Sequence, residues 1–453
     1  MSAALLLVAP AARAQPLAAT ESRPSTPGEP TPPASRPQPA PPQRHSARSV
    51  AGAPRGDEAG GIARPEEEPA SFGRGLARGL LVIPRAAFWI ASAPVRASYW
   101  LTERYKVPLR VREALFNDEG TAGLVPIGWA ETGFGVGGGA RFFHRDLLGR
   151  GEHLVAAGGF GGRVEPGATI WGDTGDRLGD RLRFRLDGTF ERRQREHFYG
   201  TGNADEVVDT RFHERLAVVG ASGELRIAGP LAVRASSEAR WFRVDTASDA
   251  VEPLPGSGED RATTYHQLSL GVDSRERPAR SEPPGPRATG VALSAFAGAA
   301  SGPAHGRFGG AASAQLPLGS RQRLLVLRAL GDGVTGPVDD IPFVDLPALG
   351  GPLSLRGYPA DRFRDRVRGL ASAEYRFDLG DSLGAFLFGD AGRVGRDPSD
   401  LVAGDLRAGF GGGLDVRRGE LLLGRLTIAS SIDGGLFVSA AFDPLGTPEG
   451  EAP

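Results

Sequence analysis

The segment Arg181–Phe190 reads RLRFRLDGTF, and the segment Asp405–Val416 reads DLRAGFGGGLDV. In both, apolar residues alternate with charged residues and glycines, the period of two that places side chains on opposite faces of a β-strand. Each segment has about ten residues, the length of a tilted strand that crosses a bilayer. A charged, glycine-rich second face suits the interior of a closed cylinder better than the open face of a soluble sandwich. The pattern therefore predicts a transmembrane β-barrel.

The same alternation recurs from about residue 120 onward and gives sixteen candidate strands. Bacterial single-chain barrels have an even number of antiparallel strands. We therefore predict an all-β fold, a 16-stranded antiparallel transmembrane β-barrel over residues 120–443. The candidate strands are 122–130, 134–144, 152–161, 165–172, 182–193, 213–227, 230–244, 263–274, 289–300, 307–316, 321–332, 368–378, 383–394, 404–416, 420–431 and 434–443.

Four long polar gaps separate some of these strands, at 194–212, 245–262, 275–288 and 333–367. Outer-membrane barrels carry their long loops on the outer face, so we expect most of these gaps there. The gap 275–288 fits the alternation of strand direction poorly, and the sequence leaves its side open.

The composition excludes several classes of function. Lys and Arg number 53 and Asp and Glu 54, so the net charge of −1 excludes a nucleic-acid binder that works by bulk charge. Cysteine is absent, which excludes disulfides, thiolate metal sites and cysteine nucleophiles. No apolar run approaches the roughly 18 residues of a membrane-spanning helix.

The residues before the barrel divide into three parts. Residues 1–14 have an apolar stretch and an A-x-A site, the pattern of a secretory signal peptide. Residues 15–71 hold 13 of the 37 prolines and are expected to form a disordered linker. Residues 72–119 contain basic and aromatic amphipathic stretches, which we expect to be short helices that either lie in the membrane interface or pack on or inside the barrel. A short tail, 444–453, follows the barrel.

Three motifs follow one another in the C-terminal third: GGPLSLRGY at 350–358, SAEYRF at 372–377 and FGDAG at 388–392. In order and spacing they resemble the BamA/TamA superfamily of outer-membrane assembly barrels, also called the bacterial surface antigen family. The R-G-Y triplet is similar to the family motif at the tip of a long loop that folds back into the lumen. The other two are similar to its twelfth and thirteenth strands. The resemblance covers about 120–443 and implies a location in the bacterial outer membrane.

The chemistry of these motifs predicts a contact between the loop and the barrel wall. A guanidinium inside a barrel has five donors and needs acceptors, which carboxylates on neighbouring strands could supply. We predict that Arg356 holds the loop 333–367 to the inner wall as a latch. The alternative is one of many lumen ion pairs that only rigidify a pore. The predicted latch residues are Arg356, Gly357, Tyr358, Glu374, Phe388, Asp390 and Gly392.

The resemblance also implies a seam. In the superfamily the first and last strands pair poorly, and their junction opens sideways into the lipid. Here it would join 122–130 to 434–443, with Gly434 and Gly435 opening the last strand and weakening it. Phe442 is the expected equivalent of the family's terminal aromatic residue. The alternative is an ordinary barrel corner.

The function implied by the resemblance is assistance in inserting or translocating proteins through this seam. The expected partners are outer-membrane lipid and unfolded outer-membrane or secreted proteins. Nothing in residues 15–119 resembles the POTRA modules that receive clients in most relatives, so delivery is expected to be missing or to come from a separate periplasmic partner. The alternative is a passive outer-membrane pore, or a structural surface antigen, with the long loop as its plug.

Motifs of other classes have simpler interpretations. GDSLG at 380–384 fits a hydrolase string around Ser382, but no helix is expected after it and the last histidine is His305, upstream. We predict a tight turn there, no catalytic residue and no enzyme. GFGVGG at 133–138 is better interpreted as a glycine-rich strand than as a nucleotide loop. The seven histidines lack metal-ligand spacing, so we expect no metal and no cofactor.

Overall fold

The computed structural model describes residues 115–443, apart from 180, 204–208, 248–253, 255, 276–286, 303, 337–340, 403 and 419–420. The predictions for the signal peptide, the linker, nearly all of 72–119 and the C-terminal tail lie outside the described residues. Within the described part, no helix is both long enough and apolar enough to span a bilayer.

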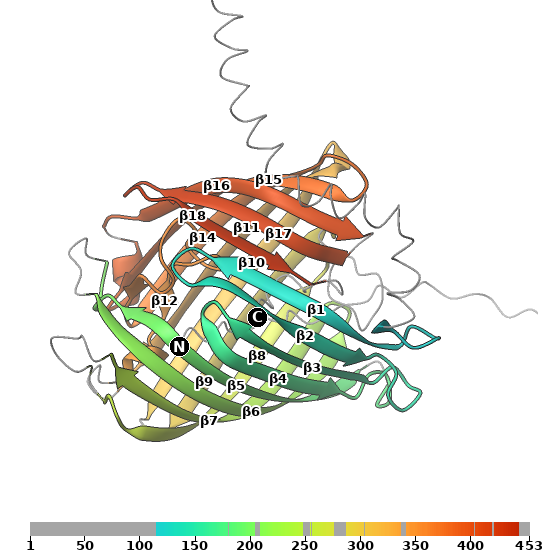
Figure 1. Cartoon of the computed structure of the whole chain (residues 1–453), viewed down its shortest axis with the longest axis horizontal. Helices are drawn as coiled ribbons and strands as arrows, with labels where there is room; N and C mark the ends of the chain where they lie inside the picture. Colours follow the sequence, from blue (N-terminus) through green and yellow to red (C-terminus); the bar gives the residue numbers. More distant parts are fainter. Residues whose placement is uncertain are drawn as a thin grey trace, which may run out of the picture. The chain divides into compact units, whose positions relative to one another are not determined.

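Sixteen antiparallel strands form one closed barrel, in which β1 pairs with both β2 and β18 (Figure 1). Two further short strands, β12 and β13, pair with each other outside the barrel sheet. The barrel strands are β1 (Ala122–Glu131), β2 (Gly135–His144), β3 (His153–Gly161), β4 (Val164–Asp173), β5 (Leu182–Phe198), β6 (Thr210–Ala228), β7 (Leu231–Thr246), β8 (Asp260–Asp273), β9 (Gly290–Ser301), β10 (His305–Leu318), β11 (Ser320–Thr335), β14 (Val367–Asp378), β15 (Leu383–Gly395), β16 (Arg407–Arg418), β17 (Leu421–Ser431) and β18 (Phe437–Phe442).

The predicted fold is therefore confirmed, and each of the sixteen candidate segments overlaps one barrel strand. The main differences are at the ends. β5 runs to Phe198 and β6 starts at Thr210, so the predicted gap 194–212 shrinks to 199–209. The stretch is polar and was therefore predicted to be a loop, yet Glu196 within it is buried in the lumen, where an ion pair with Arg163 accommodates it.

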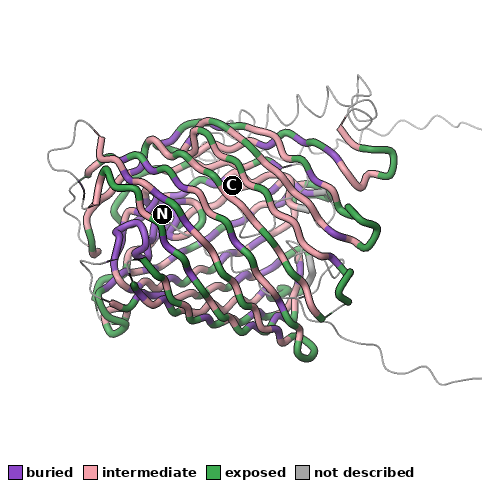
Figure 2. Tube along the Cα trace, turned by 90° about the horizontal axis from the view of Figure 1, so that it is seen from below, coloured by how far each residue is buried: buried purple, intermediate pink, exposed green. Residues whose placement is uncertain are grey.

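The alternation of side chains follows the two faces of the wall, and Figure 2 shows exposed and less exposed positions alternating along the strands. On β8, Thr263, Tyr265 and Asp273 are buried, whereas Leu268 and Leu270 are 60% and 51% exposed. An apolar outer face around a charged interior is the pattern of a transmembrane barrel.

The direction of the strands decides the side of every connection. Antiparallel neighbours alternate in direction, so the connections that follow β5, β7, β11 and β15 share one end of the barrel, which we call the loop end. β8 ends and β9 begins at the opposite end, with the short turns. This settles the side that the sequence left open.

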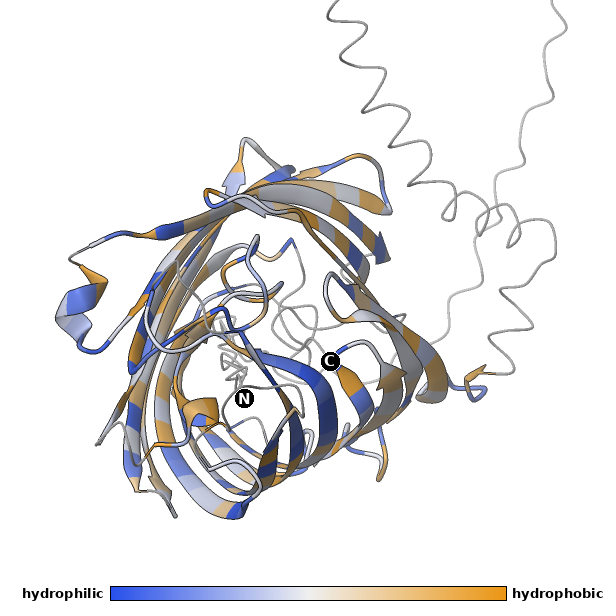
Figure 3. Ribbon diagram, turned by 60° about the vertical axis from the view of Figure 1, so that its left-hand side comes forward, coloured by the Kyte–Doolittle hydropathy of each residue, from blue (hydrophilic) through white to orange (hydrophobic). Residues whose placement is uncertain are grey.

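In the connection from β11 to β14, the described residues 341–366 are folded into the barrel, and Figure 3 shows ribbon inside the ring of strands. It contains a short 3-10 helix, η2 (Phe343–Asp345), and the strands β12 (Ala348–Leu349) and β13 (Phe363–Arg364). One half packs on β6 and β7 through Phe343 and Val344, and the other half on β14 and β15 through Leu349 and Leu355. The loop and the barrel wall therefore build two of the buried apolar clusters together.

The outer face gives a first prediction. Leu268→Arg, in the middle of β8, should destabilise the barrel in lipid vesicles by about 2–4 kcal/mol, because a charge replaces a lipid-facing side chain. The matched control is Ser269→Arg, on the lumen face of the same strand, which should cost much less. Urea unfolding in vesicles measures both. Equal losses would contradict the assignment of the two faces.

Candidate functional site at the loop tip and the strand seam

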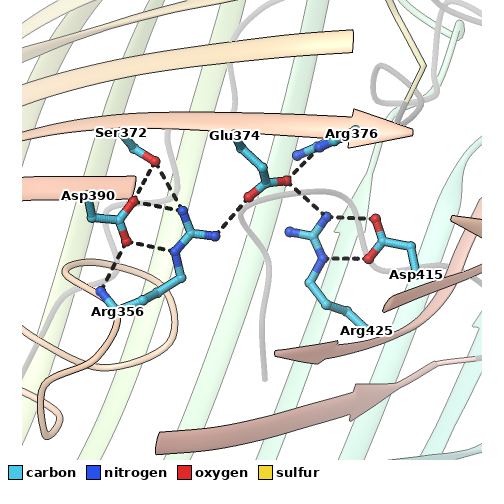
Figure 4. Close-up of polar contacts among 7 residues, drawn as sticks. All are labelled: Arg356, Ser372, Glu374, Arg376, Asp390, Asp415 and Arg425. Carbon is cyan, nitrogen blue, oxygen red and sulfur yellow. Dashed lines mark hydrogen bonds and ion pairs between the residues drawn. The ribbon is translucent and has the colours of Figure 1, made fainter. Parts of the chain in front are cut away.

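The tip of the long loop is joined to the barrel wall through Arg356. Its guanidinium donates to both oxygens of Asp390, Nε to Oδ2 at 2.7 Å and Nη2 to Oδ1 at 2.7 Å, and from Nη1 to Glu374 Oε2 at 2.8 Å (Figure 4). Nη2 also donates to Ser372 Oγ at 3.1 Å, and the backbone N–H of Arg356 donates to Asp390 Oδ2. The guanidinium carbon lies 3.5 Å from the centre of the Phe388 ring. The structure thus brings four of the predicted residues together.

Strand register explains why these side chains converge. Ser372 on β14 lies opposite Asp390 on β15, and Glu374 lies opposite Phe388, so all four point into the lumen from adjacent strands. The carboxylates of Glu374 and Asp390 are almost fully buried, at 1% and 0% exposure. Burial alone would lower the pKa of Arg356, but the hydrogen bond and charge of Asp390, with the charge of Glu374, raise it above its ordinary value. The arginine is therefore permanently charged.

Glu374 also links Arg356 to a second set of charged side chains on the barrel wall. Its other oxygen accepts from Arg376 Nε at 2.6 Å and lies 3.5 Å from Arg425 Nη2. Arg425 in turn forms a two-bond pair with Asp415 (Figure 4). Such a connected network satisfies each buried charge, and the loss of one member leaves the others short of partners.

Three glycines allow the loop tip to approach the wall closely. Gly357 has φ +93°, and a Cβ there would overlap the carbonyl oxygen of Ser430 on β17. A Cβ on Gly409 of β16 would overlap the carbonyl oxygen of Arg356. At Gly392, a Cβ would lie 3.0 Å from both the Gly369 carbonyl oxygen and the Leu349 side chain. Backbone here lies directly on backbone, which only glycine permits.

Tyr358 extends the loop tip toward β18. Its hydroxyl donates to Asp433 Oδ2 at 2.8 Å, in the turn 432–436 that joins β17 to β18. Its ring packs edge-on against Phe363, 5.0 Å away. Burial and the hydrogen bond to Asp433 raise the pKa of Tyr358 to about 12. The residue therefore stays a neutral donor across the physiological range.

A second group of buried charges holds the loop on the other side of the seam. Arg163, in the turn between β3 and β4, donates to Glu196 on β5 at 2.6 and 2.7 Å and to Asp361 of the loop at 2.7 Å. Arg364 Nη2 lies 3.6 Å from the same Asp361 carboxylate. Burial lowers the pKa of Arg163, but the charges of Glu196 and Asp361 outweigh it and raise the pKa well above its ordinary value.

The seam between the first and last strands is short. β1 pairs with β2 along all ten of its residues, but with β18 only along Gly128–Glu131 opposite Ser439–Phe442. Thr132 extends it by one residue: its backbone N–H donates to the Val438 carbonyl at 2.9 Å, and its Oγ1 accepts from the backbone N–H of Val438 at 2.8 Å. For the residues of β1 that precede Gly128, the described part of β18 provides no further pairing partner.

The predicted start of the last strand, at Gly434, is wrong. β18 begins at Phe437, and Gly434 and Gly435 lie in the preceding turn with φ +91° and +89°. Ser431 Oγ donates to the Gly434 carbonyl and Ser430 Oγ to the Gly435 carbonyl, which fixes the turn. Their glycine character is required by the left-handed turn rather than by a weakened strand. Phe442 does end β18, opposite Gly128, with its side chain half exposed on the outer face.

The chain's own approach to the barrel touches the free edge of β1. Residues 117–122 turn back, with the Asn117 N–H donating to the Ala122 carbonyl, and Phe116 forms an isolated antiparallel bridge with Gly123. The Phe116 ring packs edge-on against Phe143 of β2 at 5.8 Å. Since β2 occupies the other edge, this bridge lies on the side of β1 that faces β18.

Several residues of this site escaped the sequence analysis. Ser372 could have been found, because it shares a strand face with Glu374 two positions on. Asp433, Arg163 and Asp361 had no such signal, since each acts through a partner that is remote in sequence. Ser382 lies at the end of the β14–β15 turn, where its carbonyl accepts from the Arg417 N–H. In the described part of the chain, no three acidic or histidine side chains cluster closely enough to hold a metal ion.

The fold and site define a class: a bacterial outer-membrane β-barrel whose longest loop is folded into the lumen and ion-paired to the wall. The chain belongs to the Omp85 superfamily, whose domain model matches residues 147–433. No curated protein matches the chain.

Two solved structures have a similar fold. One is BamA from Haemophilus ducreyi lacking POTRA domains 1–3, with a TM-score of 0.51, 13% identity and coverage of 71% of this chain and 70% of that one. The other is CdiB from Escherichia coli, with a TM-score of 0.50, 12% identity and coverage of 70% and 62% respectively. The chain thus spans less than two thirds of the CdiB chain, and at these identities the likeness is one of fold.

The glycine contacts give a second prediction. Gly409→Ala should displace the loop tip, because the added methyl group would overlap the Arg356 carbonyl oxygen. Limited proteolysis of the loop in the folded barrel should become faster. The matched control is Gly389→Ala on β15, where a Cβ meets nothing within 4 Å, and it should leave proteolysis unchanged. Equal cleavage rates in both variants would refute the close approach.

The Tyr358 hydroxyl gives a third prediction. Its pKa is raised above the ordinary value of 10.0 to about 12, so the folded state holds this proton more tightly than the unfolded chain. The stability it contributes should be complete below pH 10 and lost as the pH rises from about 10 to about 12. The difference in phenolate absorbance between wild type and Tyr358→Phe measures this ionisation, and a difference spectrum with its midpoint at pH 10 would contradict it.

Proposed function

We propose that this barrel assists the insertion or translocation of proteins at the outer membrane through the seam between β1 and β18. The observation that carries the proposal is the short pairing at this seam, four residues on each strand, in a wall where β1 pairs with β2 along its full length. An unpaired strand edge presents N–H and C=O groups to any extended chain. A client strand can add to such an edge through main-chain hydrogen bonds.

The edge that would receive a client is the first half of β1. Residues 124–127 lie between the Gly128 pairing and the Phe116 bridge, and the described residues provide no backbone partner for them on the side facing β18. Leu124, on this edge, is 49% exposed on the outer face, so a strand added here would continue an apolar surface into lipid. Such a client would displace only one isolated bridge.

Arg356 and its carboxylate partners would act as the latch that holds the loop against β14, β15 and β16. With the loop in this position, the β17–β18 turn is tied to the loop tip through Tyr358. Removal of the arginine would leave Glu374 and Asp390 buried without their shared cation, at a cost of about 3–5 kcal/mol. The loop would then leave the wall, and the seam would lose its support.

The test is an insertion assay in liposomes. An outer-membrane barrel client, diluted from urea, should fold faster in liposomes that contain the wild-type protein than in empty ones. Dilution from urea supplies the client directly, so a separate periplasmic delivery partner is not needed for this test. Arg356→Ala should lose most of the acceleration, because its loop is released. Client folding is followed by its heat-modifiable migration.

The matched control is Arg234→Ala. Arg234 is also a lumen arginine paired with a carboxylate, Glu224 at 3.0 Å, but both lie on the wall strands β6 and β7, away from the loop tip. This variant should keep the wild-type rate. A folded Arg356→Ala barrel with wild-type activity would remove the latch from the mechanism. Wild-type protein no faster than empty liposomes would favour the alternative, a passive pore or structural surface antigen plugged by its loop.

A further inference from the structure

Four consecutive loop residues, Tyr358 to Asp361, lie between the two sides of the seam. At one end, the Tyr358 hydroxyl donates to Asp433 in the β17–β18 turn. Asp433 is held in place by Arg407 of β16, whose Nη1 donates to the same oxygen at 3.0 Å. This end therefore belongs to the β18 side of the seam.

At the other end, Asp361 accepts from Arg163 at 2.7 Å. Arg163 is fixed by Glu196 on β5, and its guanidinium carbon lies 5.3 Å from the centre of the Phe134 ring. Phe134 is buried in the turn 132–134 that directly follows β1, and its N–H donates to the Glu131 carbonyl. This end therefore belongs to the β1 side.

The backbone of Asp361 points to the same constraint. Its φ is +55°, the only positive φ of a non-glycine residue in the described part of the chain. Aspartate and asparagine adopt this left-handed region more readily than other non-glycine residues, and surrounding contacts hold the residue in it. Here those contacts are the ion pairs to Arg163 and Arg364. The turn is thus held in the shape that carries the carboxylate to the β1 side.

We propose that Tyr358 and Asp361 form a clasp that holds the seam closed from inside the lumen, with Asp433 and Arg163 as its two anchors. The clasp deepens the proposed function, since it assigns positioning residues to the seam that clients would use. It is distinct from the contact of Arg356 with β14 and β15, because neither anchor lies on those strands.

A clasp with two anchors in series has a characteristic energetic signature. Either anchor alone leaves the segment attached to one side only, so loss of one anchor releases the seam and loss of the second adds little. Residues that act through one element couple in this way, whereas independent structural contacts contribute additively. Tyr358→Phe removes the hydroxyl that donates to Asp433 at 2.8 Å and, at 3.4 Å, to the Ala408 carbonyl. Asp361→Asn removes the charge that pairs with Arg163 and Arg364.

The experiment is hydrogen exchange of the full chain in lipid vesicles, with no client present. The amides of β18 should exchange about fivefold faster in Tyr358→Phe and in Asp361→Asn, the change that one lost hydrogen bond or ion pair produces. The double variant should exchange about as fast as either single one. The amides of β15, which pairs fully with β14, should be unchanged and serve as the internal reference.

Two controls complete the design. Ala130→Cys with Ala440→Cys places a disulfide between register partners across the seam, in a chain that has no cysteine of its own. When this disulfide is formed, the clasp variants should no longer accelerate β18 exchange. Glu224→Gln, which alters a wall ion pair remote from the seam, should leave β18 exchange at the wild-type rate.

Three results would overturn the clasp: unchanged β18 exchange in both single variants, effects that multiply in the double variant, or equal acceleration in β15. Because no client takes part, these outcomes are independent of the insertion assay. A barrel with an intact clasp that fails to fold clients would reject the proposed function alone. A barrel that folds clients while its β18 exchange ignores both substitutions would reject the clasp alone.

Discussion

A charged guanidinium inside a barrel must find its acceptors there, and the position of the loop tip depends on the acceptors of Arg356. Asp390 and Glu374 supply the charges, Ser372 a further oxygen and Phe388 the ring beneath. Because these partners lie on two adjacent strands, the arginine can be satisfied only if the loop backbone lies against the wall. Glycines at the points of closest approach make that possible.

The loop in turn supplies contacts at the seam, where the pairing of the wall strands is short. A closed sheet needs its first and last strands to pair, and here β18 has only six residues against the ten of β1. Apolar loop residues fill the space inside the strands, and the loop tip contacts the turns on both sides of the short seam. The shortest strand pairing of the barrel therefore lies beside a loop whose tip is bonded to turns on both sides of it.

Most strands of the wall could be predicted, because the alternation that identifies a strand lies within a few neighbouring residues. The alternation of Leu182, Phe184 and Leu186 with arginines identifies both a strand and its outer face without knowledge of any partner. The meeting of Arg356 with Glu374 and Asp390 could be expected, because the resemblance placed the R-G-Y triplet at the tip of a loop in the lumen and the two carboxylates on neighbouring strands. Gly434 and Gly435 were predicted in the last strand but lie in the turn before it, since a glycine in a turn and a glycine in a weak strand look alike in sequence.

By itself, the sequence determined the number of strands, the polarity of their two faces and the residues available to a buried ion pair. The strands and their faces follow from a period of two, which neighbouring residues are enough to reveal. Only the tertiary structure decided where β1 stops pairing with β18, at which end of the barrel β8 ends and β9 begins, and that Asp361 reaches Arg163. These depend on closure of the barrel and on the path of a loop across its lumen. Both bring together residues that are far apart in the chain and carry no shared local pattern.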